Sequence, residues 1–184
     1  MSAKSLAKID TAVADRLRSA SEQAMTAFSN AQGGAVDIVS ALDTAQYIAE
    51  LRELFDVPQI KDRIVALQDT PIGFRTDKDP RQKKKGPDGK KSDEYNTPYA
   101  YPVVRDCAIE ATLRGLQMVG NQWNIISYRC YVTKEGFEAL IRKVKGLSDF
   151  APVLDVPRKM EGGAIVHCVA TWSLNGKPGE CKAA

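Results

Sequence analysis

Hydrophobic residues recur at helical spacing through the first third of the chain and predict three helices. The first is long and ends near residues 30–34, where two glycines stop it. The second covers roughly residues 36–55, and its apolar face is expected to pack on the first helix or on a neighbouring subunit. Pro58 can begin a third helix, because proline fits a first turn, and Thr70-Pro71 ends it. The two apolar faces consist of Leu6, Ile9, Val13, Leu17 and Ala20, and of Ile38, Leu42, Ala45, Ile48, Ala49 and Arg52.

The hydrophobic period changes to two after residue 121. Two short runs rich in β-forming residues, 123–126 and 128–132, flank Ser127 and predict a tight hairpin. Alternation in the second run separates a buried face from an outer face. The buried set is Tyr128, Cys130 and Val132, and the outer set is Arg129, Tyr131 and Thr133. One face of the hairpin is therefore expected to be dry, while the other carries a cation beside an aromatic ring.

A helix is predicted to follow this hairpin directly, with Thr133 as its cap and Gly146 at its end. Its apolar stripe is Phe137, Leu140, Ile141 and Val144, and its basic residues are Arg142, Lys143 and Lys145.

Another helix is predicted before the hairpin, starting near residues 97–102. Its buried face is Val103, Val104, Cys107, Ala108, Ala111 and Leu116. Strands are expected at 150–156 and 164–174, joined across a turn at 161–163, and Asn175-Gly176 is a second strong turn signal. The pattern predicts an α+β fold, in which N-terminal helices precede a small antiparallel β-hairpin and helix core in helix–hairpin–helix–hairpin order.

Part of this core resembles a known family. A helix ending in Arg114-Gly115-Leu116, then a hairpin, then the helix Lys134-Glu-Gly-Phe-Glu-Ala-Leu-Ile-Arg142 is similar to the core of the RecT and Red-beta single-strand annealing proteins of phage recombination. The likeness covers roughly residues 99–176. It implies a further strand and a long helix after the last turn, so the chain is expected to be truncated at its C-terminus.

Positive charge is concentrated in one short segment, although the net charge of the chain is only +3. Residues 1–74 hold seven Lys or Arg against ten Asp or Glu, whereas residues 75–91 hold eight against three. Prolines and glycines accompany the lysines and no apolar pattern does, which predicts a flexible basic loop. We expect an N-terminal helical assembly region at 1–74, this loop at 75–96 and a DNA-binding α+β core at 97–184.

Catalytic chemistry finds little support in the sequence. The only histidine, His167, alternates with apolar residues in a predicted strand, where a packed or surface role fits better than a base or ligand. Residues 86–92 look like a phosphate-binding loop but lack its spacing, and no strand precedes them. The four cysteines are too far apart for a zinc pair, and Cys107, Cys130 and Cys168 are expected to be buried free thiols. We therefore expect no enzymatic activity, no cofactor and no metal.

Binding to a single strand uses what the chain does contain, since cations can follow phosphates while aromatic groups contact bases. The resemblance implies ATP-independent binding and annealing of single-stranded DNA in homologous recombination, by a homo-oligomeric ring or filament that also holds the annealed duplex intermediate. It also implies a phage exonuclease or a host single-strand-binding protein as a partner. The expected DNA-binding residues are Arg75, Lys78, Lys83, Lys84, Lys85, Lys90, Lys91, Arg114, Tyr128, Arg129, Tyr131, Lys134, Arg142 and Lys143.

Two other functions remain open from the sequence. The protein could coat single strands without annealing them, or it could be an oligomeric structural protein whose basic loop contacts another protein. A solvated loop and core aromatic side chains are the ordinary explanations for the lysines and for Trp123, Tyr128 and Tyr131. The absence of a signal peptide and of a long apolar run predicts a cytoplasmic protein with no membrane contact.

Overall fold

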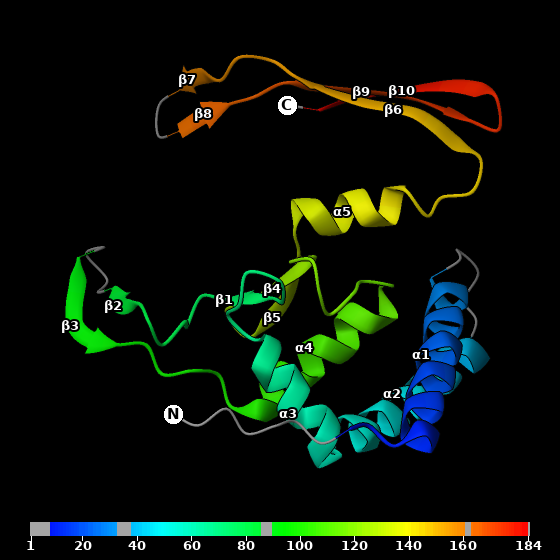
Figure 1. Cartoon of the computed structure of the whole chain (residues 1–184). Coiled ribbons are helices and arrows are strands. Elements are labelled where there is room, and N and C mark those ends of the chain that lie inside the picture. The colour runs from blue at the N-terminus through cyan, green and yellow to red at the C-terminus, as the bar shows by residue number, and fades with distance from the viewer. Residues whose placement is uncertain (1–7, 33–37, 86–89, 161–162, 184) are drawn as a thin grey trace. The chain divides into compact units, whose positions relative to one another are not determined.

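The computed structural model describes residues 8–32, 38–85, 90–160 and 163–183. The chain is α+β and divides into two units, residues 1–139 and residues 140–184, each described by itself below (Figure 1). In the described part of the chain, no helix combines the length and hydrophobicity needed to span a bilayer.

Three helices open the first unit: α1 (Thr11–Ala31), α2 (Ile38–Asp56) and α3 (Pro58–Leu67). The Asp10 carboxylate caps α1 by accepting hydrogen bonds from the first-turn amides. Pro58 occupies the first turn of α3, as predicted. The buried residues of α1 are all alanines, Ala20, Ala24 and Ala27, so this helix and α2 pack closely.

The predicted apolar face of α2 is not its packed face. Ile38 and Leu42 are exposed, and the buried side of the N-terminal half is formed by Ser40 and Thr44. The Thr44 hydroxyl donates to the Ser40 carbonyl at 2.7 Å, so its polar group is satisfied within the helix. Small polar residues can therefore face α1, and the hydrophobic pattern alone misidentified that side. Whether a neighbouring subunit covers the apolar side stays a prediction.

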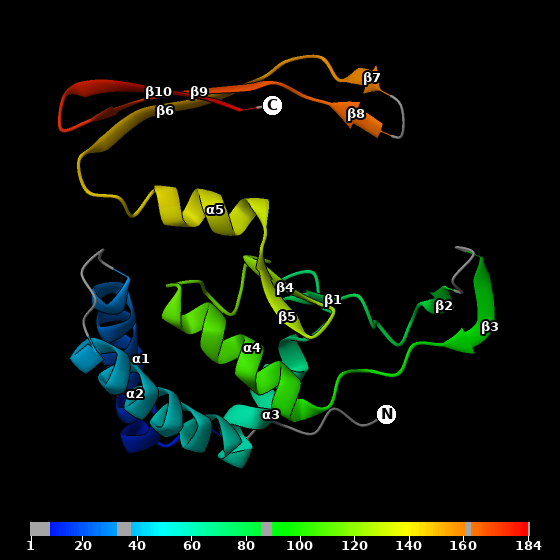
Figure 2. The same ribbon diagram turned by 180° about the vertical axis from the view of Figure 1, so that it is seen from behind.

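The core of the first unit is a three-stranded sheet with the order β1-β4-β5, formed by β1 (Arg75–Thr76), β4 (Trp123–Ile126) and β5 (Arg129–Val132). Strand β1 runs parallel to β4, and β4 and β5 form the predicted antiparallel hairpin. Helix α4 (Tyr101–Leu113) packs against one face of this hairpin (Figures 1 and 2). On that face Trp123 is completely buried and stacks on Phe74 with 4.1 Å between ring centroids.

Helix α4 ends where the sequence predicted. Gly115 has a positive φ of 75°, and the Leu116 amide donates to the Ala111 carbonyl at 2.9 Å. This is the Schellman arrangement, in which glycine takes the left-handed position after the helix.

The expected flexible basic loop contains secondary structure. Strands β2 (Lys83–Lys85) and β3 (Lys91–Tyr95) pair antiparallel, and residues 86–89 lie outside the described chain. A buried carboxylate, that of Asp79, anchors the start of this hairpin by accepting hydrogen bonds from the amide and guanidinium of Arg81. The sequence analysis did not predict these strands, because the contacts at the start of the hairpin are polar, whereas an apolar period was sought.

Helix α5 (Lys134–Ile141) begins as predicted, since the Thr133 hydroxyl accepts from the Gly136 amide at 3.1 Å. It ends at Ile141 rather than at Gly146, which instead adopts a φ of 76° in the turn that precedes the next strand. The expected burial of its apolar stripe is not found, because Phe137 is 57% exposed and Val144 is also exposed.

The second unit is built from strands, namely β6 (Leu147–Leu154), β7 (Arg158–Met160), β8 (Gly163–Ile165), β9 (Cys168–Leu174) and β10 (Lys177–Ala183). A sheet with the order β10-β9-β6 is antiparallel throughout, and β7 and β8 form a separate small hairpin whose turn residues 161–162 lie outside the described chain. The predicted Asn175-Gly176 turn is confirmed, with both residues at positive φ.

His167 lies between β8 and β9 and is exposed, so it is not the strand residue that was expected.

Candidate nucleic-acid interface

The outer face of the β1-β4-β5 sheet carries cations, an aromatic ring and an apolar side chain together. Cross-strand pairing places Asn124 opposite Tyr131, Ile126 opposite Arg129, and Arg75 beside Asn124. Directly opposed residues share one face of a sheet, so these five form a single surface, called here the hairpin face. Tyr131 is 45% exposed, and Arg75, Ile126 and Arg129 are also exposed. Helix α4 covers only the opposite face, where Trp123 and Cys130 point.

Neither Arg75 nor Arg129 forms an ion pair among the described residues, although Arg75 lies near enough to Asp79 to help lower the pKa of that carboxyl. Asn124 fixes the position of β1, because its side-chain oxygen accepts from the Arg75 amide at 3.2 Å. The guanidinium groups are thus held on a short, well-anchored sheet and are available to an anion such as phosphate.

The tip of the β4–β5 hairpin differs from the prediction. Tyr128 was expected on the dry face of a strand, but it occupies the turn with Ser127 and is 61% exposed. Lys78 reaches it from the segment after β1, donating from Nζ to the Tyr128 hydroxyl at 2.7 Å. The same ammonium lies 4.1 Å from the Tyr128 ring centroid and 4.5 Å from that of Tyr99, distances typical of cation–π contacts.

Polar contacts behind the tip connect it to the core. The Asp77 carboxylate accepts from the Tyr99 hydroxyl at 2.7 Å and from the Ser127 amide at 3.0 Å, and the Tyr99 oxygen accepts from the Tyr128 amide at 3.2 Å. Burial, together with the bond to Asp77, raises the pKa of Tyr99 to about 12, so this hydroxyl stays protonated at neutral pH. We call Asp77, Lys78, Tyr99, Ser127 and Tyr128 the tip cluster.

The basic β2–β3 hairpin is less positive than its lysines suggested. Lys83 pairs with Asp93 at 3.1 Å and Lys84 with Glu94 at 2.7 Å, and the latter contact lowers the pKa of Glu94. Asp93 and Glu94 lie just after the charged segment of residues 75–91. When they are included, residues 75–95 hold eight Lys or Arg against five Asp or Glu.

The remaining lysines of that hairpin are less fully described. Lys90 is exposed. Lys85 and Lys91 pair across β2 and β3, but their side chains lie outside the described part of the chain.

Four other predicted site residues are not part of the hairpin face. Arg114 ends α4 and pairs with Glu110 at 2.6 Å, and Lys134 lies 3.8 Å from Glu138 in α5. Arg142 and Lys143 are exposed residues of the second unit and are not counted in the hairpin face.

Sequence reasoning missed Asn124, Ile126, Asp77 and Tyr99. The first two were within reach, because the alternation that made residues 123–126 a strand also puts them on one face. Asp77 and Tyr99 meet the tip only through contacts between residues 22 to 50 positions apart, for which the sequence gives no local signal.

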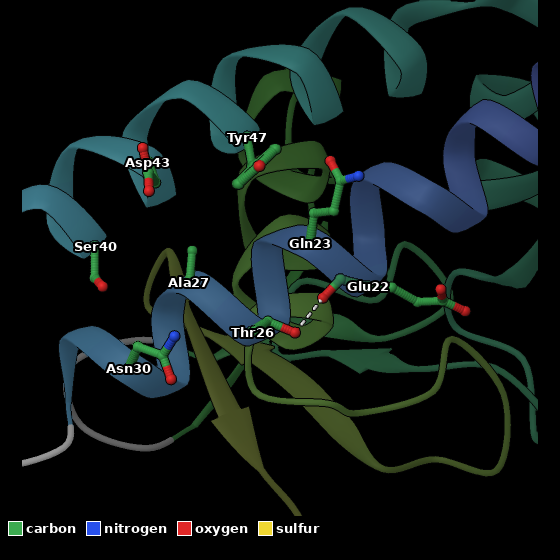
Figure 3. Close-up of a pocket in the computed structure, with 8 residues that line it drawn as sticks. All are labelled: Glu22, Gln23, Thr26, Ala27, Asn30, Ser40, Asp43 and Tyr47. Atoms are coloured by element: carbon green, nitrogen blue, oxygen red, sulfur yellow. Dashed lines mark hydrogen bonds between the residues drawn. The ribbon is translucent and has the colours of Figure 1, made fainter.

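The cleft between α1 and α2 is a poor site for a nucleic acid. It encloses about 310 Å³, and Figure 3 shows side chains from both helices around it. No lysine or arginine is among its described lining, which includes the carboxylates of Glu22 and Asp43. Phosphates would therefore meet negative charge there.

A second cleft, of about 260 Å³, adjoins the hairpin face at Arg75. Arg81 also lines it, together with the buried carboxylates of Asp69 and Asp79. Hydrogen bonds from Arg81 keep the pKa of Asp79 below its ordinary value, so the charges in this cleft balance one another.

The thiols do not form a reactive site. Cys107 and Cys130 are buried as predicted, and burial raises their pKa values to about 11 and 12, which keeps both protonated. Cys168 is only half-buried, contrary to the prediction, because the second unit buries none of its described side chains. Within the described ranges, no group of three or more His, Cys, Asp or Glu side chains is placed to hold a metal ion.

No protein-family model matches this chain, and neither a curated protein nor a solved structure does.

Proposed function

We propose that this protein binds single-stranded DNA along the hairpin face and the tip cluster, and that it anneals complementary strands without ATP. The observation that carries the binding proposal is the joint exposure of Arg75, Arg129 and Tyr131 on one sheet face whose other side is buried. Cations that meet phosphates, beside rings that meet bases, are the two components of single-strand recognition without sequence preference.

The individual roles follow from side-chain chemistry. Arg75 and Arg129 supply planar guanidinium groups that can grip a phosphate through two donors. Tyr131 and Ile126 supply apolar surface beside them on the same face, which can contact the faces of unstacked bases. Asn124 holds β1 in register, so the spacing between the two arginines is fixed before the strand binds.

Annealing and assembly rest on the resemblance to RecT and Red-beta. Contacts to phosphates and base faces leave the pairing edges of the bases free, so a complementary strand can be tested by base pairing alone. Subunits arranged side by side in a ring or filament would extend the hairpin faces into a longer track. A phage exonuclease or a host single-strand-binding protein would be further partners.

The deciding experiment measures fluorescence anisotropy of a labelled oligonucleotide at several salt concentrations, and then adds its complement in the absence of nucleotide. Salt-sensitive binding followed by accelerated duplex formation is the expected result. Salt-sensitive binding that blocks pairing would indicate a coating protein instead. No DNA affinity at low salt would refute the proposal and favour a structural protein whose basic hairpin contacts another protein.

A further inference from the structure

The turn at the tip of the β4–β5 hairpin is made by residues that do not favour its conformation. Ser127 and Tyr128 have φ values of 50° and 66°, so both central positions of the two-residue turn are left-handed. Such turns usually use Asn-Gly, because a bulky side chain is strained at positive φ. A tyrosine held there against its preference points to a functional reason for the ring at that position.

The strain is held by contacts that converge on the turn backbone. Asp77 accepts from the Ser127 amide, and Tyr99 accepts from the Tyr128 amide while donating to Asp77. Tyr99 is itself buried, and the Asp77 amide donates to the Ile125 carbonyl at 3.1 Å, so both anchors belong to the packed part of the sheet. The backbone of the turn is therefore fixed from behind, and its tyrosine ring projects outward.

The ring has two supporting contacts and is otherwise largely exposed. Tyr99 meets it edge to face, with centroids 4.9 Å apart and an angle of 74°, and the Lys78 ammonium lies 4.1 Å from its centroid. These contacts restrict the ring while leaving Tyr128 61% exposed. An aromatic ring held in place and open to solvent is suited to stack on another flat group, because little side-chain freedom is lost when it does.

We propose that Tyr128 is a stacking subsite for one unpaired nucleobase, with Asp77 and Tyr99 as its positioning residues. The proposal rests on the proposed function and specifies which form of nucleic acid the tip recognises. Base faces are hidden in a duplex and open in a single strand, so the subsite favours single-stranded over double-stranded DNA. The contribution of Tyr128 is largely independent of salt, whereas that of the arginines on the hairpin face is not.

The test uses the whole protein and a thymidine oligonucleotide that contains one 2-aminopurine, whose fluorescence falls when it stacks. Tyr128→Gly is the informative variant, because glycine fits the left-handed turn and removes only the ring. Tyr128→Phe keeps the ring and loses the hydroxyl. Tyr95→Gly is the control, since Tyr95 is 59% exposed in β3 and carries a comparable ring outside the tip cluster.

We expect Tyr128→Gly to abolish quenching and to reduce the single-strand preference about tenfold, as for the loss of one stacked base, with an unchanged salt slope. Tyr128→Phe should retain the quenching, and Asp77→Ala should weaken it although the ring is present. If folded Asp77→Ala quenches the fluorescence as well as the unaltered protein does, Asp77 has only a structural role, and its assignment as a positioning residue is overturned.

The two proposals fail in different ways. Full quenching and full single-strand preference in folded Tyr128→Gly would refute the stacking subsite, while salt-dependent binding that is lost in Arg129→Ala would still support the hairpin face. If the unaltered protein fails to bind the oligonucleotide, both the subsite and the proposed function are refuted.

Discussion

Replacing Arg75 and Arg129 by alanine should flatten the salt dependence of DNA binding by a calculable amount. Each phosphate contact on a single strand contributes about −0.7 to the slope of log affinity against log salt concentration. Two lost contacts therefore change the slope by roughly 1.4. For a fourfold rise in salt concentration, the factor by which the affinity falls is then roughly seven times smaller in the double variant than in the unaltered protein. Both side chains are exposed and lack an ion pair among the described residues, so the double variant should fold normally.

The assay is fluorescence anisotropy with a labelled thymidine oligonucleotide between low and moderate salt. Replacing Arg16 and Arg18 by alanine is the matched control, because both are exposed residues of α1, where they pair with Glu50 and Asp15. That double variant loses the same two charges far along the sequence from the sheet and should keep the original slope. Equal slopes for the double variant and the unaltered protein would refute the assignment of these arginines to phosphates.

Three further predictions concern charge, acid stability and the core. Replacing Asp93 and Glu94 by Asn and Gln should tighten DNA binding and steepen its salt slope, because Lys83 and Lys84 lose their ion-pair partners. Unchanged anisotropy curves would exclude the β2–β3 hairpin from the interface. Asp79→Asn should lower the free energy of unfolding by about 1.5–3 kcal/mol at pH 7. The folded-state pKa of Asp79 is depressed below 3.8, so this difference should begin to shrink in urea titrations once the pH falls below 3.8 and should vanish below the folded-state pKa, and a pH-independent difference would contradict the ion-pair account. Trp123→Ala should cost about 3–5 kcal/mol by the same titrations, since its ring is fully buried against Phe74; a loss under about 1 kcal/mol would show that the stack is not part of the core.

Local signals in the sequence were sufficient for much of the fold. Pro58 begins α3, Thr133 caps α5, and Asn175-Gly176 forms the turn between β9 and β10, each for a reason contained within a few residues. The alternation of β5 correctly separated buried Cys130 from exposed Arg129 and Tyr131. These features depend on the backbone preferences of single residues and on one strand period, which the sequence displays directly.

Other features depend on contacts that the sequence does not display. The packed side of α2 uses Ser40 and Thr44, so hydrophobicity indicated the wrong face. Strand β1 pairs with β4 across 49 residues, which placed Arg75 on the hairpin face although the sequence assigned it to a loop. The turn at Ser127 and Tyr128 lacks the Asn-Gly pair that favours two left-handed residues, and polar groups distant in the sequence hold it.

The central claim is that the β4–β5 hairpin contacts a single strand, and photo-crosslinking tests it most directly. The unaltered protein is irradiated with a thymidine oligonucleotide containing 5-iododeoxyuridine, and the attached peptides are identified by mass spectrometry after trypsin digestion. We predict attachment to the peptide of residues 115–129, which contains Tyr128, and to that of residues 130–134, which contains Tyr131. Attachment confined to peptides of α1 and α2, with none in residues 115–134, would contradict it.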